Sequence, residues 1–361
     1  MLQTLAFGGT LAKRLVEDAP QTSQPPVALY FLGVANLVVF LPVLLIYQAD
    51  RLPQLFYTFQ YVYPTLAAVE DPLPAYEALA MNDDDGQPKN GKTPMRTAQP
   101  GMPITASIRA TNRLIRSLNG WLSNFRGLGY SVLIGILTGL STLFFAMFGF
   151  IPRPVGHLFA LVIAAPLSTT WTHLVVTRPS AKSFAQRIPA LKKVYRATWL
   201  PTFLVWAAAN ACVYFPILLA GLIGLELRYP ERPDQIGSQL PTSSDARKAL
   251  AVLGLSLALQ VLLYIPAETA LTRVQASLLP PDEDTIVPFD RSFAGRVGPE
   301  LVTGKGFATF GAAIKSVTRA SWARIYLQRL KLFAVSMAIY FAVITVVMVE
   351  ALIVTAIQGS Q

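Results

Sequence analysis

Few side chains in this 361-residue sequence could carry out catalysis or hold a metal ion. The chain contains two histidines, His157 and His173, and one cysteine, Cys212. They are too few and too scattered for a metal cluster or a disulfide framework. No nucleophile–base pair and no pair of carboxylates on one helix face can be assembled from the residues around them. The sequence therefore predicts no enzyme, no metal site and no cofactor.

Polar groups inside long apolar runs are the more informative candidates: His173, Asn210, Gln260, Glu268 and Glu350. Ionisable groups within a bilayer are costly and are functional candidates by default. Each also has a simpler interpretation. Glu268 and Arg273 could satisfy each other, His173 could lie at the membrane interface, and Glu350 could reach the headgroup region. Arg126, Arg196 and Arg324 are expected to be interfacial anchors.

The composition indicates a multi-pass membrane protein. The chain is 53% hydrophobic and 14% charged, whereas soluble domains carry about 25% charged residues. Apolar runs long enough to span a bilayer occur at residues 27–47, 129–151, 157–177, 199–225, 249–272 and 332–357. These six predicted spans place both termini on one side of the membrane. Residues 1–26 are expected to be an N-terminal tail without a targeting segment.

Positive charge is concentrated in three loops. Residues 51–128, 177–198 and 272–331 hold 23 of the 30 Lys and Arg residues, which predicts that these loops share one compartment. The net charge of +10 is explained by membrane topology, because the basic residues are not grouped with stacking aromatics as a nucleic-acid site requires. The predicted partners are the lipid bilayer and other membrane proteins, and no nucleic acid is expected.

Two stretches 100 residues apart are similar. Ala165 to Val176 reads APLSTTWTHLVV, and Ile265 to Leu279 reads IPAETALTRVQASLL. Pro166 aligns with Pro266, and His173 aligns with Arg273. A fixed offset between similar stretches indicates a duplicated unit.

These stretches resemble the signature of the mitochondrial carrier family, Pro-x-Asp/Glu-x-x-Lys/Arg-x-Lys/Arg-x-Gln. The second copy matches at Pro266, Glu268, Arg273 and Gln275 and departs at Leu271. A second family element, Gly, four residues, an aromatic, Lys/Arg and Gly, matches in full from Gly120 through Arg126 to Gly127. A further copy is assigned to the first predicted span, residues 27–47, where Pro42 takes the proline position.

The resemblance implies an all-α membrane protein with six transmembrane helices in three two-helix repeats. Repeat 1 would contain a first helix with a long polar loop (27–128, with 82–104 expected to be disordered) and a second helix (129–151). Repeat 2 would cover 152–225, a polar linker 226–248, and repeat 3 would cover 249–357. The resemblance also implies a mitochondrial membrane, and a cardiolipin contact at Gly120, Arg126 and Gly127.

The family's ion-pair gate is eroded in this sequence. A ring of three pairs needs three acids and three bases, but Glu268 is the only acid, and Tyr47, Trp171 and Leu271 occupy the basic positions. The positions expected to read the substrate, Ile134, Val205 and Val335, are apolar, whereas a multiply charged solute would need basic partners. The sequence therefore favours a non-exchanging adaptor or a protein- or lipid-handling factor. The alternative is a carrier-type transporter of an uncharged or apolar solute.

Overall fold

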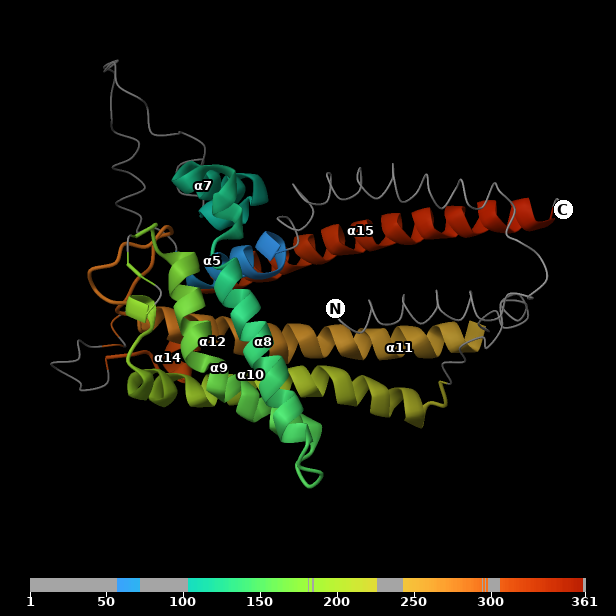
Figure 1. The fold of residues 1–361 in the computed structure, drawn as a ribbon, viewed down its shortest axis with the longest axis horizontal. Helices are drawn as coiled ribbons and strands as arrows, with labels where there is room; N and C mark the ends of the chain where they lie inside the picture. The colour runs from blue at the N-terminus through green and yellow to red at the C-terminus, as the bar shows by residue number, and fades with distance from the viewer. Residues whose placement is uncertain are drawn as a thin grey trace, which may run out of the picture. The chain divides into compact units, whose positions relative to one another are not determined.

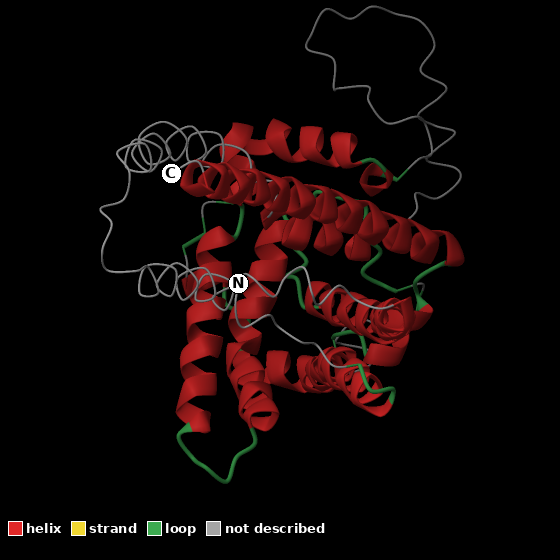
Figure 2. Cartoon of the chain, turned by 90° about the vertical axis from the view of Figure 1, so that its right-hand side faces the viewer, coloured by secondary structure: helices red, strands yellow, loops and turns green. Residues whose placement is uncertain are grey.

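The computed structural model describes residues 57–71, 103–180, 182–183, 185–225, 243–293, 295, 297 and 306–359 (Figure 1). The described part is all helical, with one isolated bridge between Thr177 and Thr285 (Figure 2). The chain divides into two compact units, residues 54–338 and residues 1–53 with 339–361. The description below concerns the first unit, apart from the second half of the last helix.

The helices follow one another without sheet structure between them. The shorter elements are η2 (Thr58–Val62), α5 (Tyr63–Val69), η3 (Ile104–Ala106), α7 (Ile108–Asn119), η4 (Gly120–Phe125), η5 (Ala185–Arg187), η7 (Gln260–Tyr264) and α14 (Phe310–Lys315). The longer ones are α8 (Leu128–Ala146), α9 (Arg153–Val176), α10 (Leu191–Leu222), α11 (Ser243–Leu259), α12 (Ile265–Ser277) and α15 (Arg319–Gly359). The η2 and η7 segments are π-helical, and η3, η4 and η5 are 3-10 helices.

Four helices are long and apolar enough to cross a membrane: Ser123–Ala146, Arg153–Val176, Leu191–Leu222 and Ser244–Ser277. They coincide with four of the six predicted spans, and they identify a multi-pass membrane protein whose described part is helical. The predicted span 27–47 lies outside the described residues. The predicted span 332–357 lies inside the continuous helix α15.

Helix boundaries differ from the prediction where polar residues extend an apolar run. Helix α10 begins at Leu191, eight residues before the predicted span, because Lys192, Lys193 and Arg196 continue the helix. Helix α11 begins at Ser243, so the last residues of the predicted linker 226–248 are helical. The end of the segment 82–104, expected to be disordered, includes the described residues Pro103 and Ile104, and Ile104 begins η3.

Three prolines recur at nearly equal intervals in helices that contact one another. They are Pro64 in α5, Pro166 in α9 and Pro266 in α12, and they are separated by 102 and 100 residues. Pro64 and Pro266 each stand second in a helix that directly follows a π-helical segment. A proline lacks the N–H that a continuous α-helix would use, and a π-segment shifts the hydrogen-bond pattern before it.

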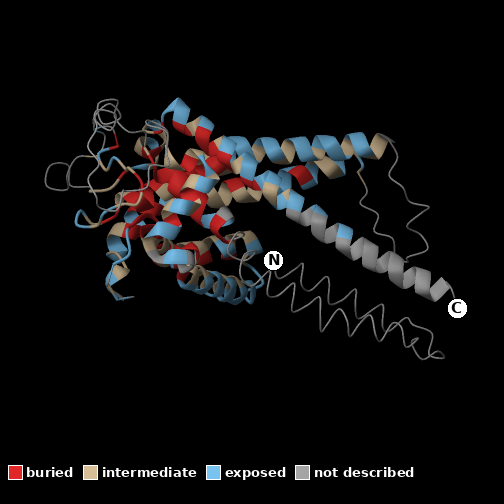
Figure 3. Cartoon of the chain, turned by 90° about the horizontal axis from the view of Figure 1, so that it is seen from above, coloured by how far each residue is buried: buried red, intermediate tan, exposed pale blue. Residues whose placement is uncertain are grey.

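Each pair among α5, α9 and α12 is in contact. Residues of all three helices contribute to a core with α7, which contains Leu66, Ile115, Val176 and Ala276. A second core joins α9, α10, α12 and α14 and includes Val194, Val274 and Phe293. Figure 3 shows the buried residues gathered around this meeting point, with exposed residues along the outer stretches of the long helices. The exposed stretches are rich in large apolar side chains, as expected for a lipid-facing surface.

Candidate functional site

A cluster of polar side chains lies where the C-terminal turns of α5, α9 and α12 meet the first turns of α15. We call this cluster the polar junction and define it as Glu70, Asp71, His173, Arg273, Gln275 and Arg324. Glu70 and Arg273 are each 1% exposed. A buried charge is tolerated only when it is paired and hydrogen-bonded, so the partners of each member identify what holds these helices together.

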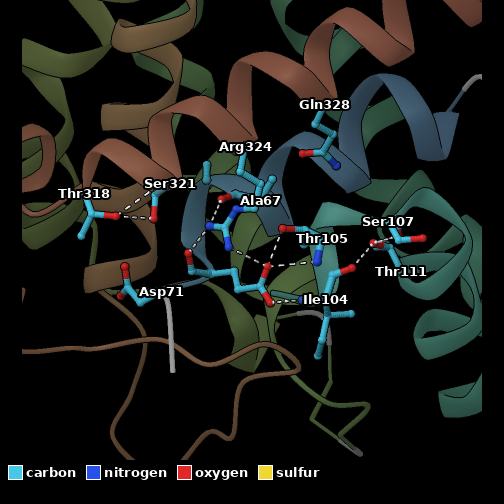
Figure 4. A network of polar contacts seen from close by, with 12 residues as sticks. Ala67, Asp71, Ile104, Thr105, Ser107, Thr111, Thr318, Ser321, Arg324 and Gln328 are labelled. Carbon is cyan, nitrogen blue, oxygen red and sulfur yellow. Dashed lines mark hydrogen bonds and ion pairs between the residues drawn. The ribbon is translucent and has the colours of Figure 1, made fainter. Parts of the chain in front are cut away.

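Glu70 lies at the C-terminal end of α5 and binds two separate parts of the chain. Its partners Ile104, Thr105 and Arg324 are shown in Figure 4. Its carboxylate accepts hydrogen bonds from the backbone N–H groups of Ile104 (2.7 Å) and Thr105 (3.0 Å) and from the Thr105 hydroxyl. Arg324 Nη1 lies 3.1 Å from Glu70 Oε2, and its Nη2 donates to the carbonyls of Ala67 and Glu70. Glu70 therefore joins α5 to η3 and to α15.

Arg324 was expected to be an interfacial anchor, and this prediction is wrong. Its side chain is 8% exposed, and burial lowers its pKa against the opposing effect of Glu70. The reason is the position at which α15 begins. Because the helix begins at Arg319, Arg324 lies in its second turn and is directed against α5 rather than toward lipid.

Arg273 joins α12 to α5 and to the segment before α15. Its Nη1 donates to the Ala68 carbonyl (3.0 Å), and its Nη2 lies 3.0 Å from Asp71 Oδ1. The same Nη2 donates to Ser316 Oγ (3.2 Å). The guanidinium carbon also lies 5.2 Å from the ring centroid of Phe293, within the range of a cation–π contact. Arg273 thus connects three segments that are distant in the sequence.

Gln275 joins α12 to α9. Its Oε1 accepts a hydrogen bond from the Thr172 hydroxyl (2.7 Å), and its Nε2 donates to Ser168 Oγ (3.1 Å). His173 Nε2 lies 2.8 Å from the Gln275 carbonyl and must donate, because a carbonyl oxygen only accepts. His173 is therefore buried within the junction, where it contacts α12.

The third side of the junction joins α9 to the start of η2 and α8. Trp171 Nε1 donates to the Tyr57 hydroxyl (2.8 Å), which in turn donates to the Arg126 carbonyl (3.0 Å). Arg126 Nε donates to the carbonyl of Leu174 in the last turn of α9. Arg126 was expected to be an interfacial anchor. In the structure it is half-buried, and its bond to Leu174 helps to cap α9. Polar contacts consequently connect α12 to α5 and to α9, and they connect α9 to Tyr57, which precedes η2 and α5.

Glu268 pairs with a residue that the sequence did not suggest. Its Oε2 forms an ion pair with Arg329 Nη2 of α15 at 2.5 Å. The predicted partner, Arg273, is bonded to Asp71 instead, so the expected pairing of Glu268 with Arg273 is wrong. The two residues are five positions apart on α12, and their side chains leave the helix in different directions toward α15 and α5.

The remaining candidate residues lie outside the junction. Asn210 Nδ2 donates to the Trp206 carbonyl of its own helix (2.8 Å), and Gln260 is exposed at the start of η7. Glu350 belongs to α15, and Pro42 lies outside the described residues. Gly120 has a positive φ of 65° at the end of α7. Arg196 is exposed near the start of α10, as expected for an anchor.

Sequence reasoning missed three residues that matter here, Pro64, Glu70 and Asp71, and it assigned a different role to Arg324. The signal for the first was available, because Pro64 precedes Pro166 by 102 residues, close to the 100-residue offset of the other pair. With Pro64 as the first proline, Asp71, His173 and Arg273 all stand seven residues after a proline. No comparable spacing points to Glu70 or Arg324, because their partnership spans 254 residues.

The outer edge of the junction carries an exposed ion-pair group. Lys182 Nζ lies 2.6 Å from Glu283 Oε1 and 3.2 Å from Asp282 Oδ2. Its hydrogen bonds, first to Glu283 and then to Asp282, raise the pKa of Lys182. These residues flank a small hollow of about 160 Å³ that is also lined by His173 and Arg187.

Gly127 supplies a sharp test of the packing at this site. It has a φ of 78°, and a Cβ at this position would lie 2.9 Å from Trp171 Nε1 and 3.3 Å from the Tyr57 hydroxyl. Gly127→Ala is expected to destabilise the fold by about 1–3 kcal/mol, because it adds backbone strain and displaces the Trp171–Tyr57 hydrogen bond. Thermal unfolding in detergent measures the effect. Gly129→Ala is the matched control, because nothing lies within 4 Å of its Cβ position, and its stability should be equal to or above that of the wild type.

Comparison with known proteins identifies no relative. No family model, no curated protein and no solved structure matches this chain.

Proposed function

We propose that this chain is a divergent, carrier-like protein of a mitochondrial membrane that acts as a non-exchanging adaptor or a protein- or lipid-handling factor. In this proposal the chain has three two-helix repeats. Each would contain a proline-bearing helix, a short connecting helix and a long second helix. The order of the described elements supports this division: α5, α7 and α8 form the first group, α9, η5 and α10 the second, and α12, α14 and α15 the third.

The repeat is more regular when Pro64, rather than Pro42, is taken as its first proline. Pro42 required an inserted loop to bring the first repeat into register, whereas Pro64 needs almost none. The matching π-segments before Pro64 and Pro266 are a second shared feature. We therefore assign the first repeat to Pro64 instead of Pro42.

One observation carries the adaptor role: the proline helices are held together by buried ion pairs and hydrogen bonds, in which each buried carboxylate and guanidinium has at least one partner. Opening the junction would separate Glu70 from Arg324 and Arg273 from Asp71. Breaking one such buried pair costs about 3–5 kcal/mol. A transport cycle would need comparable contacts to form elsewhere as these break. The five ion pairs that join one described residue to another all involve the junction, its neighbour Glu268 or the adjoining Lys182. This arrangement favours a single closed state.

The second candidate, transport of an uncharged or apolar solute, is favoured by a different aspect of the same site. Besides the apolar core, hydrogen bonds and ion pairs link its helices. Such links can break and reform in a defined way when two arrangements have similar free energies.

Uptake by liposomes containing the purified protein distinguishes the two roles. We expect no saturable uptake of any member of a metabolite panel, and we expect a stable partner to co-purify from mitochondrial membranes. Gln275→Leu, which removes the links from α12 to Ser168 and Thr172, provides the control. Saturable uptake that this substitution abolishes would establish the transporter and reject the adaptor.

Fractionation of mitochondria into inner and outer membranes tests the proposed location. Recovery of the protein in neither fraction would reject it. The proposed cardiolipin contact at Gly120, Arg126 and Gly127 is tested by mass spectrometry of lipid that co-purifies with the wild type and with Arg126→Gln. Equal cardiolipin in both samples would remove Arg126 from that contact.

A further inference from the structure

Helix α7 presents a row of arginines on the face opposite its buried side. Arg109, Arg113 and Arg116 are exposed and occur at intervals of four and three residues, which places them on one face of an α-helix. Together with Asn112 and Ser117 they line an open hollow of about 370 Å³. We call these five residues the arginine face.

The other side of α7 is fully used by the fold. Ile115 is 2% exposed and belongs to the same core as Leu66 and Val176, and Ile108 and Leu114 pack against that core. The helix is therefore held in place by its apolar side, and the arginine face is directed outward. No ion pair joins these three arginines to a carboxylate among the described residues.

The position of α7 in the sequence puts the arginine face close to a membrane surface. Three residues, Gly120 to Leu122, separate Asn119 from the membrane-spanning candidate that begins at Ser123. A connection of this length reaches at most about 14 Å. Arginines so close to a span lie in the zone where basic residues interact with anionic headgroups.

We propose that the arginine face binds the anionic headgroups of the membrane that this chain spans. All five lining side chains are polar or charged, and tight protein–protein contacts usually centre on a buried apolar or aromatic anchor. The hollow has no such anchor. A laterally dense layer of phosphates instead matches three exposed arginines on one helix face, each of which can bind phosphate in a bidentate manner. The proposal depends on the membrane-spanning helices and not on the adaptor role, and it is separate from the Arg126 contact.

A fluorescent label next to the arginines provides the test in the full-length protein. Cys212 is the only cysteine, so Ser117→Cys in a Cys212→Ser background accepts a single label. The protein is placed in nanodiscs of phosphatidylcholine, with or without phosphatidylglycerol. Acrylamide serves as the quencher because it is uncharged and is not repelled by an anionic surface. We expect anionic lipid to reduce the quenching constant roughly twofold, and molar salt to reverse this protection because it shortens the screening length to about 3 Å.

Variants determine whether the arginine face causes the protection of the label by anionic lipid. The triple change Arg109→Gln, Arg113→Gln and Arg116→Gln should abolish protection, and the corresponding triple change to Lys should retain most of it. The matched control replaces three exposed arginines elsewhere, Arg153, Arg247 and Arg319, by Gln and should behave as the wild type. Circular dichroism and thermal unfolding verify that each variant is folded.

Three outcomes would overturn the proposal. The first is a quenching constant that does not respond to phosphatidylglycerol. The second is full protection in the folded triple Gln variant, which would assign the lipid response to other residues. The third is equal protection in phosphatidylcholine nanodiscs on addition of inorganic phosphate at matched ionic strength, which would indicate a site for a small free anion.

Discussion

Glu70→Gln is expected to lower the free energy of unfolding by about 3–5 kcal/mol, because it leaves Arg324 as a buried charge without its partner. The amide that replaces the carboxylate also brings two donors to a site where Ile104 and Thr105 already donate. The size of the effect follows from burial, since the Glu70 side chain is 1% exposed and that of Arg324 is 8% exposed. Chemical unfolding in detergent micelles provides the measurement.

A double-mutant cycle isolates the contribution of the pair. Arg324→Met alone should be similarly destabilising, but the double variant Glu70→Gln/Arg324→Met should lose much less than the sum of the two single changes. Asp282→Asn is the control, because its contact with Lys182 is exposed and solvent screens such pairs so that they contribute little to stability. A Glu70→Gln protein as stable as Asp282→Asn would contradict the buried pairing.

Arg273→Leu is expected to have an effect of the same order, about 3–5 kcal/mol, because it leaves the Asp71 carboxylate without its charged partner and the Ala68 carbonyl without its side-chain donor. Arg273→Lys should recover only a small part of the loss. A single ammonium group cannot reproduce the fork that reaches Ala68 through Nη1 and both Asp71 and Ser316 through Nη2, nor the guanidinium packing on Phe293. Thermal unfolding of the three proteins under identical detergent conditions checks this order.

The matched control for Arg273 is Arg291→Leu. Arg291 is also a partly buried arginine of this region, but it donates to the backbone carbonyls of Pro280 and Glu283 within its own loop. We expect a smaller loss, because no carboxylate is left unpaired. Equal losses for the two leucine variants would mean that Arg273 acts as a general packing residue rather than as the link between α12 and α5.

The predicted positions of the membrane-spanning runs agree with the structure because they depend on local composition. A bilayer requires about 20 consecutive apolar residues in a helix, and four of the predicted runs coincide with helices of that kind. The duplicated proline stretch was also visible, since Pro166 and Pro266 differ by a simple offset. The first proline was assigned differently, because Pro42 stands inside a predicted span, whereas Pro64 stands in a shorter apolar stretch outside every predicted span.

The pairing of charged residues could not be predicted from the same patterns. The family resemblance directed attention to acids and bases close to each proline and suggested that Glu268 had lost its partner. Arg329 supplies that partner from another helix. Arg324 could only be interpreted as an interfacial residue, because nothing in its neighbourhood indicates Glu70.

The sequence by itself therefore determined that this is a helical, multi-pass membrane protein with a repeated proline stretch, since hydropathy and spacing are properties of short segments. Only the tertiary structure decided how α5, α9 and α12 are joined. Burial selects ion-pair partners by their proximity in space, and Asp71 and Arg273 meet across 202 residues of chain. The physical reason is the cost of leaving a charge unpaired away from water, and that cost can be evaluated only once the packing of the helices is known.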